Sequence, residues 1–275
     1  MVIHYATATL LGSSSGRQPG PSAVRQQHCK YGPMIYFPHD IYIGGSLDKY
    51  GEYVGEETDF LLAATPEGGI VVEVGANIGC HTIPLAQKVG LSGHVVAFEP
   101  QRILHQMLCG SLAINGLWNA SAERVALGAK EGVIYVPQVA YEQDGNFGGI
   151  ALTDGPGEPV SLRTLDSFAL PALHLLKIDV EGMELDVLQG AETTIRKFRP
   201  LIYCENDRQE KSAALIAFLR SLDYDLYWHT PPLFREQNYR ECTENIFGGT
   251  VSVNMACIPK ERASQVQTNL QKVDV

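Results

Sequence analysis

The chain has 275 residues and a mass of 30.1 kDa, and 45% of its residues are hydrophobic, which is enough to bury one main core. Its formal net charge of -10 argues against a nucleic-acid partner, because such partners are bound mainly through Lys and Arg. The six cysteines form no CxxC pair, and neither a signal peptide nor a membrane span is recognisable. We therefore expect a cytoplasmic protein with reduced thiols and no membrane partner.

Four regions are expected along the chain. Residues 1–33 are rich in Ser, Gly and Pro, which predicts a flexible arm. Residues 34–69 form an N-terminal extension that packs on the core, and its first part, MIYFPHDIYIGG (34–45), has the composition of extended structure. Residues 70–260 form the main domain and residues 261–275 a C-terminal tail.

From residue 70 onward, short apolar strands alternate with helical segments, which predicts an α/β fold with a doubly wound, mostly parallel sheet. The strand 70–75 is expected at the centre. The further elements expected in chain order are a helix at 79–89, a strand at 94–100, a helix at 102–114, a strand from 174 that runs into a helix, a strand at 200–206 and a helix through 215–222. The last two strands, 223–229 and 250–258, should be antiparallel to each other near one edge.

The stretch VVEVGANIGCHT (71–82) reads as a buried strand, a glycine turn and the start of a helix. Gly75 and Gly79 bracket the turn, where the helix offers free N–H groups to a ligand. Asn77 stands where a dinucleotide site has its middle glycine, so an adenosine ligand without a pyrophosphate fits better, namely S-adenosylmethionine. Glu99, 24 positions after Gly75, ends the next strand and can bind ribose hydroxyls.

Four motifs resemble those of the FkbM family of S-adenosylmethionine-dependent methyltransferases: VVEVGANIGCHT, HVVAFEPQ, LLKIDVEGMELDVLQGA and PLIYCEND. The resemblance covers roughly residues 45–258. It implies a Rossmann-like class I methyltransferase fold and O-methylation of a hydroxylated small molecule such as a sugar or natural product. The family commonly has Asp where this chain has Glu73, which would face the cofactor's ammonium group, and its YGEY segment approaches the cofactor. The cofactor-binding residues expected on this basis are Tyr50, Glu52, Glu73, Gly75, Asn77, Gly79, Glu99, Pro100, Asp179 and Glu181.

Acidic and amide residues follow the two later strands. Asp179 and Glu181 end one strand, and Glu205 and Asn206 end the next at the same edge. Such oxygen donors suit Mg²⁺, so Asp179, Glu205 and Asn206 are a candidate metal site. Alternatively, Glu181 caps the following helix and Glu205 orients loops.

Methylation of an alcohol requires that its oxygen lose a proton. Asp179 is the first choice as proton acceptor, with Glu205 across from it, and His229 or His81 are alternatives. In a version with Mg²⁺ the cation acidifies the hydroxyl, and in a version without it Asp179 or His229 takes the proton directly.

The acceptor is expected to bind the loops 142–159 and 231–249 and their surroundings, through Phe147, Trp228, Phe234, Tyr239 and Asn245. Three other readings remain open: an NAD-dependent oxidoreductase, a methyltransferase for nucleic-acid bases and a non-catalytic S-adenosylmethionine-binding protein. The missing second glycine argues against the first. The sequence IDVEG in place of a Pro-Pro-aromatic turn argues against the second.

Overall fold

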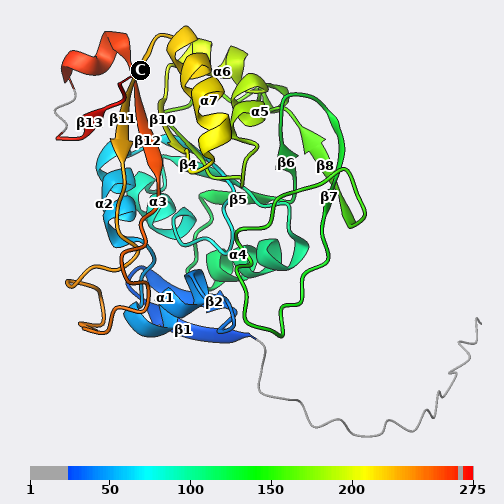
Figure 1. Cartoon of the computed structure of the whole chain (residues 1–275), viewed down its shortest axis with the longest axis vertical. Helices are drawn as coiled ribbons and strands as arrows, with labels where there is room; N and C mark the ends of the chain where they lie inside the picture. Colours follow the sequence, from blue (N-terminus) through cyan, green and yellow to red (C-terminus); the bar gives the residue numbers. More distant parts are fainter. Residues whose placement is uncertain (1–23, 266–268, 275) are drawn as a thin grey trace, which may run out of the picture.

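The structure, a computed structural model, describes residues 24–265 and 269–274. Within this part, an eight-stranded sheet has the order β13-β11-β12-β10-β9-β3-β4-β5 (Figure 1). Its strands are β3 (Ile70–Val74), β4 (His94–Phe98), β5 (Ala120–Glu123), β9 (Leu175–Ile178), β10 (Leu201–Glu205), β11 (Tyr224–His229), β12 (Asn254–Pro259) and β13 (Gln271–Lys272).

The five strands β5, β4, β3, β9 and β10 run parallel to one another. Strand β12 is inserted between β10 and β11 and is antiparallel to both. Two expectations from the sequence are therefore confirmed: β3 lies inside the sheet, between β4 and β9, and the last two predicted strands pair antiparallel near one edge.

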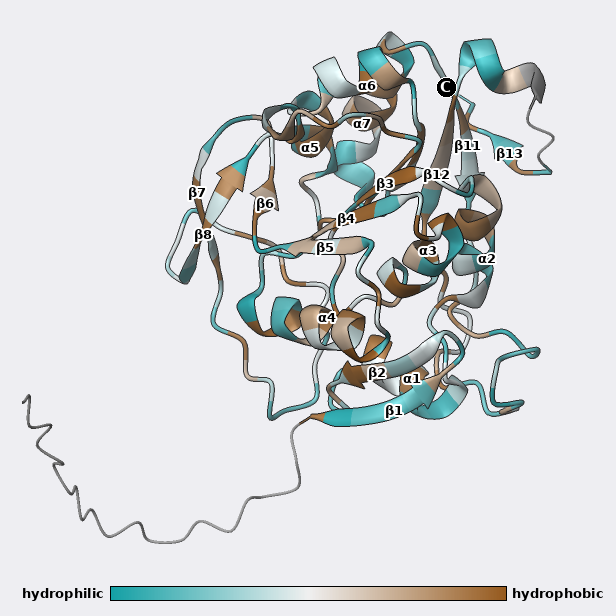
Figure 2. Cartoon of the chain, turned by 180° about the vertical axis from the view of Figure 1, so that it is seen from behind, coloured by the Kyte–Doolittle hydropathy of each residue, from teal (hydrophilic) through white to brown (hydrophobic). Residues whose placement is uncertain are grey.

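Helices cover both faces of the sheet (Figure 1). One face is covered by α2 (Gly55–Ala64), α3 (Thr82–Val89) and α4 (Arg102–Ile114), and the other by α5 (Glu184–Gln189), α6 (Glu192–Phe198) and α7 (Gln209–Ser221). Because side chains alternate along a strand, Val71 of β3 packs with Leu85 of α3, whereas Val72 packs in the cluster that holds Leu188 of α5. Strand β3 is accordingly apolar along most of its length (Figure 2).

The N-terminal region differs from the sequence prediction. Residues 1–23 lie outside the described part, but the predicted arm also included the first residues of a hairpin, β1 (Arg25–Cys29) with β2 (Gly32–Tyr36). The extended structure expected at 34–45 ends at Tyr36, and α1 (Ile43–Tyr50) begins within it. The reason is local, since the Asp40 carboxylate accepts the N–H groups of Tyr42 and Ile43 at 2.9 and 2.8 Å and so starts the helix.

The predicted main domain ends too early. Beyond residue 260, η2 (Lys260–Gln265) is followed by β13, which pairs with β11 and extends the large sheet. A second sheet has three strands in the order β6 (Ala126–Leu127), β8 (Glu158–Arg163), β7 (Gly132–Val136). It is followed by η1 (Leu165–Phe168). The single helix expected after residue 182 is two short helices, α5 and α6.

The segment 230–253, between β11 and β12, folds back over α1 and α2. The guanidinium group of Arg235 donates to both oxygens of Glu52, at 2.6 and 2.7 Å, and the main-chain N–H of Arg240 donates to the carbonyl of Tyr50 at 3.2 Å. The N-terminal extension and this late segment are thereby held together above the strand ends.

Candidate active site

A cavity of about 450 Å³ lies at the carboxyl ends of β3, β9 and β10. This is the edge at which α/β sheets bind ligands. Its lining comes from the glycine turn, the strand ends, α2 and the segments around residues 146–149 and 250–252, and includes Tyr53, Glu57, Glu73, Gly75, Asn77, His81, Glu99, Asn146, Lys177, Asp179, Glu181, Glu205, Arg208, Leu233 and Ser252.

The glycine turn after β3 needs its glycine for a reason other than ligand space. Gly75 has φ +86°, and a Cβ there would lie 1.8 Å from the main-chain oxygen of Asp179. A side chain at this position would therefore clash with the backbone that leaves β9 before it could reach a ligand. Asn77 also adopts a positive φ, +51°, at the position where dinucleotide sites have glycine.

Glu99, just after β4, is buried and held by main-chain groups. One carboxylate oxygen accepts the N–H of Asn77 and the other accepts the N–H of Gln101, both at 2.8 Å. Burial raises the pKa of Glu99 to about 7. Each oxygen retains a lone pair, so the carboxylate is oriented to accept hydroxyl groups from a ligand in the cavity.

Beyond Glu99 the cavity adjoins a narrow apolar cleft of about 40 Å³. Gly75, Glu99, Gly148, Asp179 and Glu181 line both spaces. Its walls are Phe98, Pro100, Val125, Leu127, Ile150, Leu152 and Met183, among others. A flat ring would fit here only with movement of the walls, which the flexible Met183 side chain permits. The cleft and the larger cavity thus adjoin each other at the strand ends, with Glu99 lining both.

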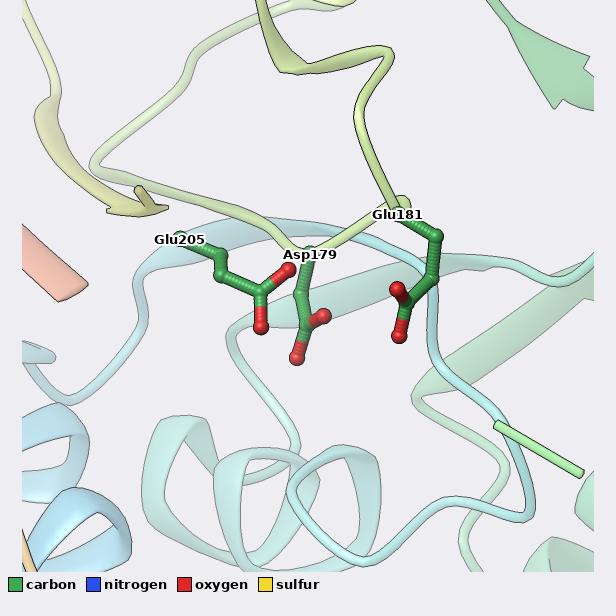
Figure 3. A group of neighbouring side chains, drawn as sticks. All are labelled: Asp179, Glu181 and Glu205. Atoms are coloured by element: carbon green, nitrogen blue, oxygen red, sulfur yellow. The ribbon is translucent and has the colours of Figure 1, made fainter. Parts of the chain in front are cut away.

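Three carboxylates meet at the strand ends (Figure 3). Oxygens of Asp179, Glu181 and Glu205 lie within 4.8 Å of one another, and the side chains point to the same side of the chain. Asp179 accepts from Lys177 Nζ at 3.0 Å, and Glu181 is paired with Arg208. Burial and the nearby charge of Asp179 raise the pKa of Glu205, whose Oε2 has no hydrogen-bond partner in the described part of the chain.

Asn206 does not belong to this group, which corrects the predicted metal site. Its amide donates to Ser212 Oγ at 2.9 Å and to Met255 Sδ at 3.3 Å. Met255 packs on the face covered by α7, whereas Glu205 lines the cavity. Side chains of consecutive strand residues point to opposite faces, so Glu205 and Asn206 cannot both face the cavity. Glu181 takes the place that the prediction gave to Asn206.

A buried group of charges lies under the cavity on the α2 and α3 side. Glu73 and Lys177 are neighbours on β3 and β9, and Glu57 approaches them from α2, with its Oε1 3.9 Å from Lys177 Nζ. Glu73 Oε2 accepts from Thr82 Oγ1 at 2.6 Å. The sequence prediction overlooked Glu57 and Lys177, although a lysine inside the apolar run HLLKI was a signal, since buried lysines require a charged partner.

Three predicted cofactor residues, Gly79, Tyr50 and Glu52, are absent from the lining of the cavity and of the adjoining cleft. Gly79 faces α4, where a Cβ would lie 2.7 Å from Leu108 Cδ1. Tyr50 is buried, and its hydroxyl donates to the carbonyl of Glu244 at 2.9 Å. Glu52 is paired with Arg235 and Lys30 instead. Their segment does approach the cavity, but through Tyr53, which lines it. In this segment Tyr53 lines the cavity, whereas Tyr50 and Glu52 are bonded to the segment 230–253.

His229 and the predicted acceptor residues also lie elsewhere. His229 Nδ1 is 2.8 Å from the Tyr203 hydroxyl and its ring packs on Phe60, so it is not part of the cavity lining. By contrast, His81 does line the cavity. The five acceptor residues expected from the sequence are likewise absent from that lining, which in their regions is formed by Asn146, Gly148, Gly149, Leu233 and Thr250–Ser252.

The fold and the sequence of this chain are similar to those of known methyltransferases. The structure has the Rossmann-like fold of class I S-adenosylmethionine-dependent methyltransferases. Its features are a parallel sheet with one inserted antiparallel strand, a glycine turn after the central strand β3 and an acidic residue after the neighbouring strand β4. The model of the methyltransferase FkbM domain matches residues 73–226, and the chain belongs to this family. S-adenosylmethionine is the cofactor expected for it.

The proteins similar to the chain include two curated relatives and a solved structure. Methyltransferase sdnD of Sordaria araneosa is 27% identical over 170 residues, 48% of this chain and 63% of the relative. Methyltransferase 1 of Beauveria bassiana is 26% identical over 154 residues, 48% of this chain and 61% of the relative. A crystal structure of methyltransferase FkbM from Methylobacillus flagellatus KT has 18% identity and a TM-score of 0.48, covering 70% of this chain and 44% of that one. The chain thus spans less than two thirds of each.

Within the described residues, no helix is both long and apolar enough to cross a membrane.

Proposed function

We propose that this chain is an S-adenosylmethionine-dependent methyltransferase that methylates a hydroxyl group of a small molecule. The observation that carries the proposal is the continuity of the site: an apolar cleft, the oriented carboxylate of Glu99 and a cavity of about 450 Å³ that ends among Asp179, Glu181 and Glu205. The net charge of -10 favours a small acceptor over a nucleic acid.

The roles of the cavity residues follow from their contacts. S-adenosylmethionine, when bound, supplies an activated methyl group. We assign proton removal from the acceptor hydroxyl to Asp179, whose carboxylate is held by Lys177 Nζ at 3.0 Å. Glu205, with its raised pKa, keeps its proton and donates a hydrogen bond to the acceptor. The main task of the site is to align the acceptor oxygen with the methyl carbon.

We propose the version of this mechanism without Mg²⁺. The three clustered carboxylates have a suitable donor type, but two of them already have cationic partners, since Asp179 is bonded to Lys177 and Glu181 to Arg208. A divalent cation would have to compete with Lys177 and Arg208 for these two carboxylates. Treatment with EDTA should therefore leave turnover unchanged, and loss of turnover that Mg²⁺ restores would show that the metal version is correct.

Two measurements test the function. S-adenosylhomocysteine should raise the thermal unfolding midpoint, because it binds only the folded state, whereas NAD should leave it unchanged. A shift with NAD alone would support the oxidoreductase reading. Methyl transfer from labelled S-adenosylmethionine is then followed into hydroxylated sugars, polyketides and, as a contrasting substrate, RNA. Binding without transfer to any of them would favour the non-catalytic alternative, and transfer to RNA would contradict the acceptor class.

A further inference from the structure

The cavity has a deep end and an open mouth. At the deep end lie Glu57, Glu73 and His81, with exposed fractions of 3%, 1% and 5%. At the mouth, Asp207 and Thr250 are exposed. An acceptor that enters and leaves in each cycle needs the mouth. The deep end therefore suits a part of the cofactor, which extends along the glycine turn from its ribose at Glu99.

Glu57 is incompletely paired for a buried carboxylate. Its Oε1 lies 3.9 Å from Lys177 Nζ and 3.8 Å from His81 Nε2. Its hydrogen-bond partners are neutral, namely the Ser252 side chain and Asn254 Nδ2, which lies 3.4 Å from Oε2. Direct charge-assisted bonds are shorter, about 2.7–2.9 Å. The Glu57 carboxylate can thus still receive a strong donor from a ligand in the cavity.

His81 provides a second, independent indication of a ligand. Its Nε2 is buried and has no hydrogen-bond partner in the described part of the chain. Burial, assisted by the charge of Lys177, lowers the pKa of His81 well below its usual range, so the imidazole is neutral. A neutral imidazole that lines a cavity and carries an unused nitrogen can donate one hydrogen bond to an anionic group.

The charges of the deep end do not balance. Lys177 faces three carboxylates, Glu57, Glu73 and Asp179. Buried charge without a partner is unfavourable, and burial accordingly raises the pKa of both Glu57 and Glu73 to about 7. One additional cation would allow both carboxylates to ionise.

We propose that Glu57 and His81 recognise the amino-acid tail of S-adenosylmethionine, with its ammonium group against the Glu57 carboxylate and its carboxylate on the free nitrogen of His81. This inference rests on the proposed function, because it takes S-adenosylmethionine as the ligand. It assigns a cofactor-binding role to α2, an element that precedes the glycine turn in the chain.

The test compares two ligands that differ in the amino-acid tail. S-adenosylhomocysteine carries the tail and 5′-methylthioadenosine lacks it. In calorimetry, Glu57→Gln should weaken S-adenosylhomocysteine about 10- to 100-fold and leave 5′-methylthioadenosine unchanged, because only the bond to the ammonium group is lost. Glu56→Gln is the matched control, since Glu56 is the preceding residue of the same helix and is exposed. This control should bind both ligands like the unmodified protein.

A second variant guards against misfolding. His81→Gln should show the same selective loss for S-adenosylhomocysteine, and it decides the matter if Glu57→Gln does not fold. Equal weakening of both ligands, or no weakening of either, overturns the inference. If the unmodified protein binds S-adenosylhomocysteine no tighter than 5′-methylthioadenosine, the tail has no site and the inference fails while the proposed function stands. If it binds neither ligand, both fail.

Discussion

The neighbours of single residues in the site determine how their side chains are oriented, and the residue type alone does not show this. Glu99 is an example, because its two oxygens are oriented by the N–H groups of Asn77 and Gln101 before any ligand arrives. Such orientation reduces the entropy lost on binding. Gly75 is another example, since a side chain at this position would clash with the main-chain oxygen of Asp179.

Replacing Glu99 should affect the nucleoside part of the ligand. We expect Glu99→Gln to weaken S-adenosylhomocysteine and 5′-methylthioadenosine alike, by about tenfold or more, since the new amide group opposes one of the two main-chain donors and a ribose contact is lost. Calorimetry with both ligands measures this. Glu123→Gln, at the end of the neighbouring strand β5, is the control with unchanged affinity. Selective loss of only one ligand would contradict the ribose assignment.

Asp179 should matter for turnover more than for cofactor affinity. We expect Asp179→Asn to reduce methyl transfer at least about 100-fold, because the amide accepts a proton poorly, while S-adenosylhomocysteine affinity changes only a few-fold. Transfer from labelled S-adenosylmethionine to an accepted hydroxyl compound provides the rate. Asp186→Asn, at an exposed position in the first turn of α5 and away from the cavity lining, should retain most of the activity. A native rate in Asp179→Asn would show that another group removes the proton.

At the scale of elements, the cavity depends on segments far apart in the chain. Helix α2 contributes Glu57, β3 and β9 contribute Glu73 and Lys177, and the segment 230–253 contributes Leu233 and Ser252. Arg235 connects this late segment to the early one through Glu52, Asp59 and the region around α2. The side chains of Arg235 and Glu52 are 15% and 4% exposed, so this ion pair is largely removed from solvent.

Arg235→Ala should therefore destabilise the protein. Among the described residues, Glu52 would keep only Lys30, at 3.1 Å, as its cationic partner, so we expect a loss of about 2–3 kcal/mol in the free energy of unfolding. The control is Lys49→Ala, which removes the Lys49–Glu244 pair between the same two regions. That pair is 42% and 64% exposed, so a clearly smaller loss is expected than for Arg235→Ala. Denaturant titration of both variants measures the two losses. Equal losses would contradict the claim that the buried Arg235–Glu52 pair stabilises the fold more than the exposed Lys49–Glu244 pair.

At the scale of the whole molecule, the buried carboxyls make stability depend on pH. Burial raises the pKa of Glu57, Glu73 and Glu99 to about 7 from an ordinary value of 4.5. A raised carboxyl pKa stabilises the fold fully below pH 4.5, and this contribution is lost as the pH rises through about 7. His81 and His229, whose pKa values are lowered by burial, act in the opposite direction below their ordinary value of 6.5.

We expect the buried carboxyls to dominate between pH 6 and pH 8, since burial also raises the pKa of Glu181 and Glu205, which act in the same direction. Glu57, Glu73 and Glu99 should each lose about 1 kcal/mol over this range, and the two histidines should recover less than that each, so the thermal unfolding midpoint should fall. Thermal scans at the two pH values measure the effect. Glu57→Gln, which removes one of the three groups, should make the fall smaller. A midpoint that rises from pH 6 to pH 8 would contradict the buried charge state.

The sequence by itself determined the parts of this protein that depend on local pattern. The apolar run of β3, its glycine turn and the periodic helix after it are specified within about twenty residues, and the same holds for Glu99 at the end of β4. The family motifs lie in these local units, so the α/β fold and the family could be recognised before the structure. The position of Asn206 could also have been read correctly, because strand alternation places it opposite Glu205.

Only the tertiary structure decided which distant residues complete the site. Glu52 is diverted from the cavity by Arg235, 183 residues later in the chain, and His229 is held by Tyr203 on another strand. Glu57 reaches the cavity because α2 packs against the sheet beside Glu73 and Lys177, which are paired on β3 and β9. These contacts depend on how helices and loops pack against the sheet. The periodicity and turn signals of one segment do not show which residue of a distant segment will contact it.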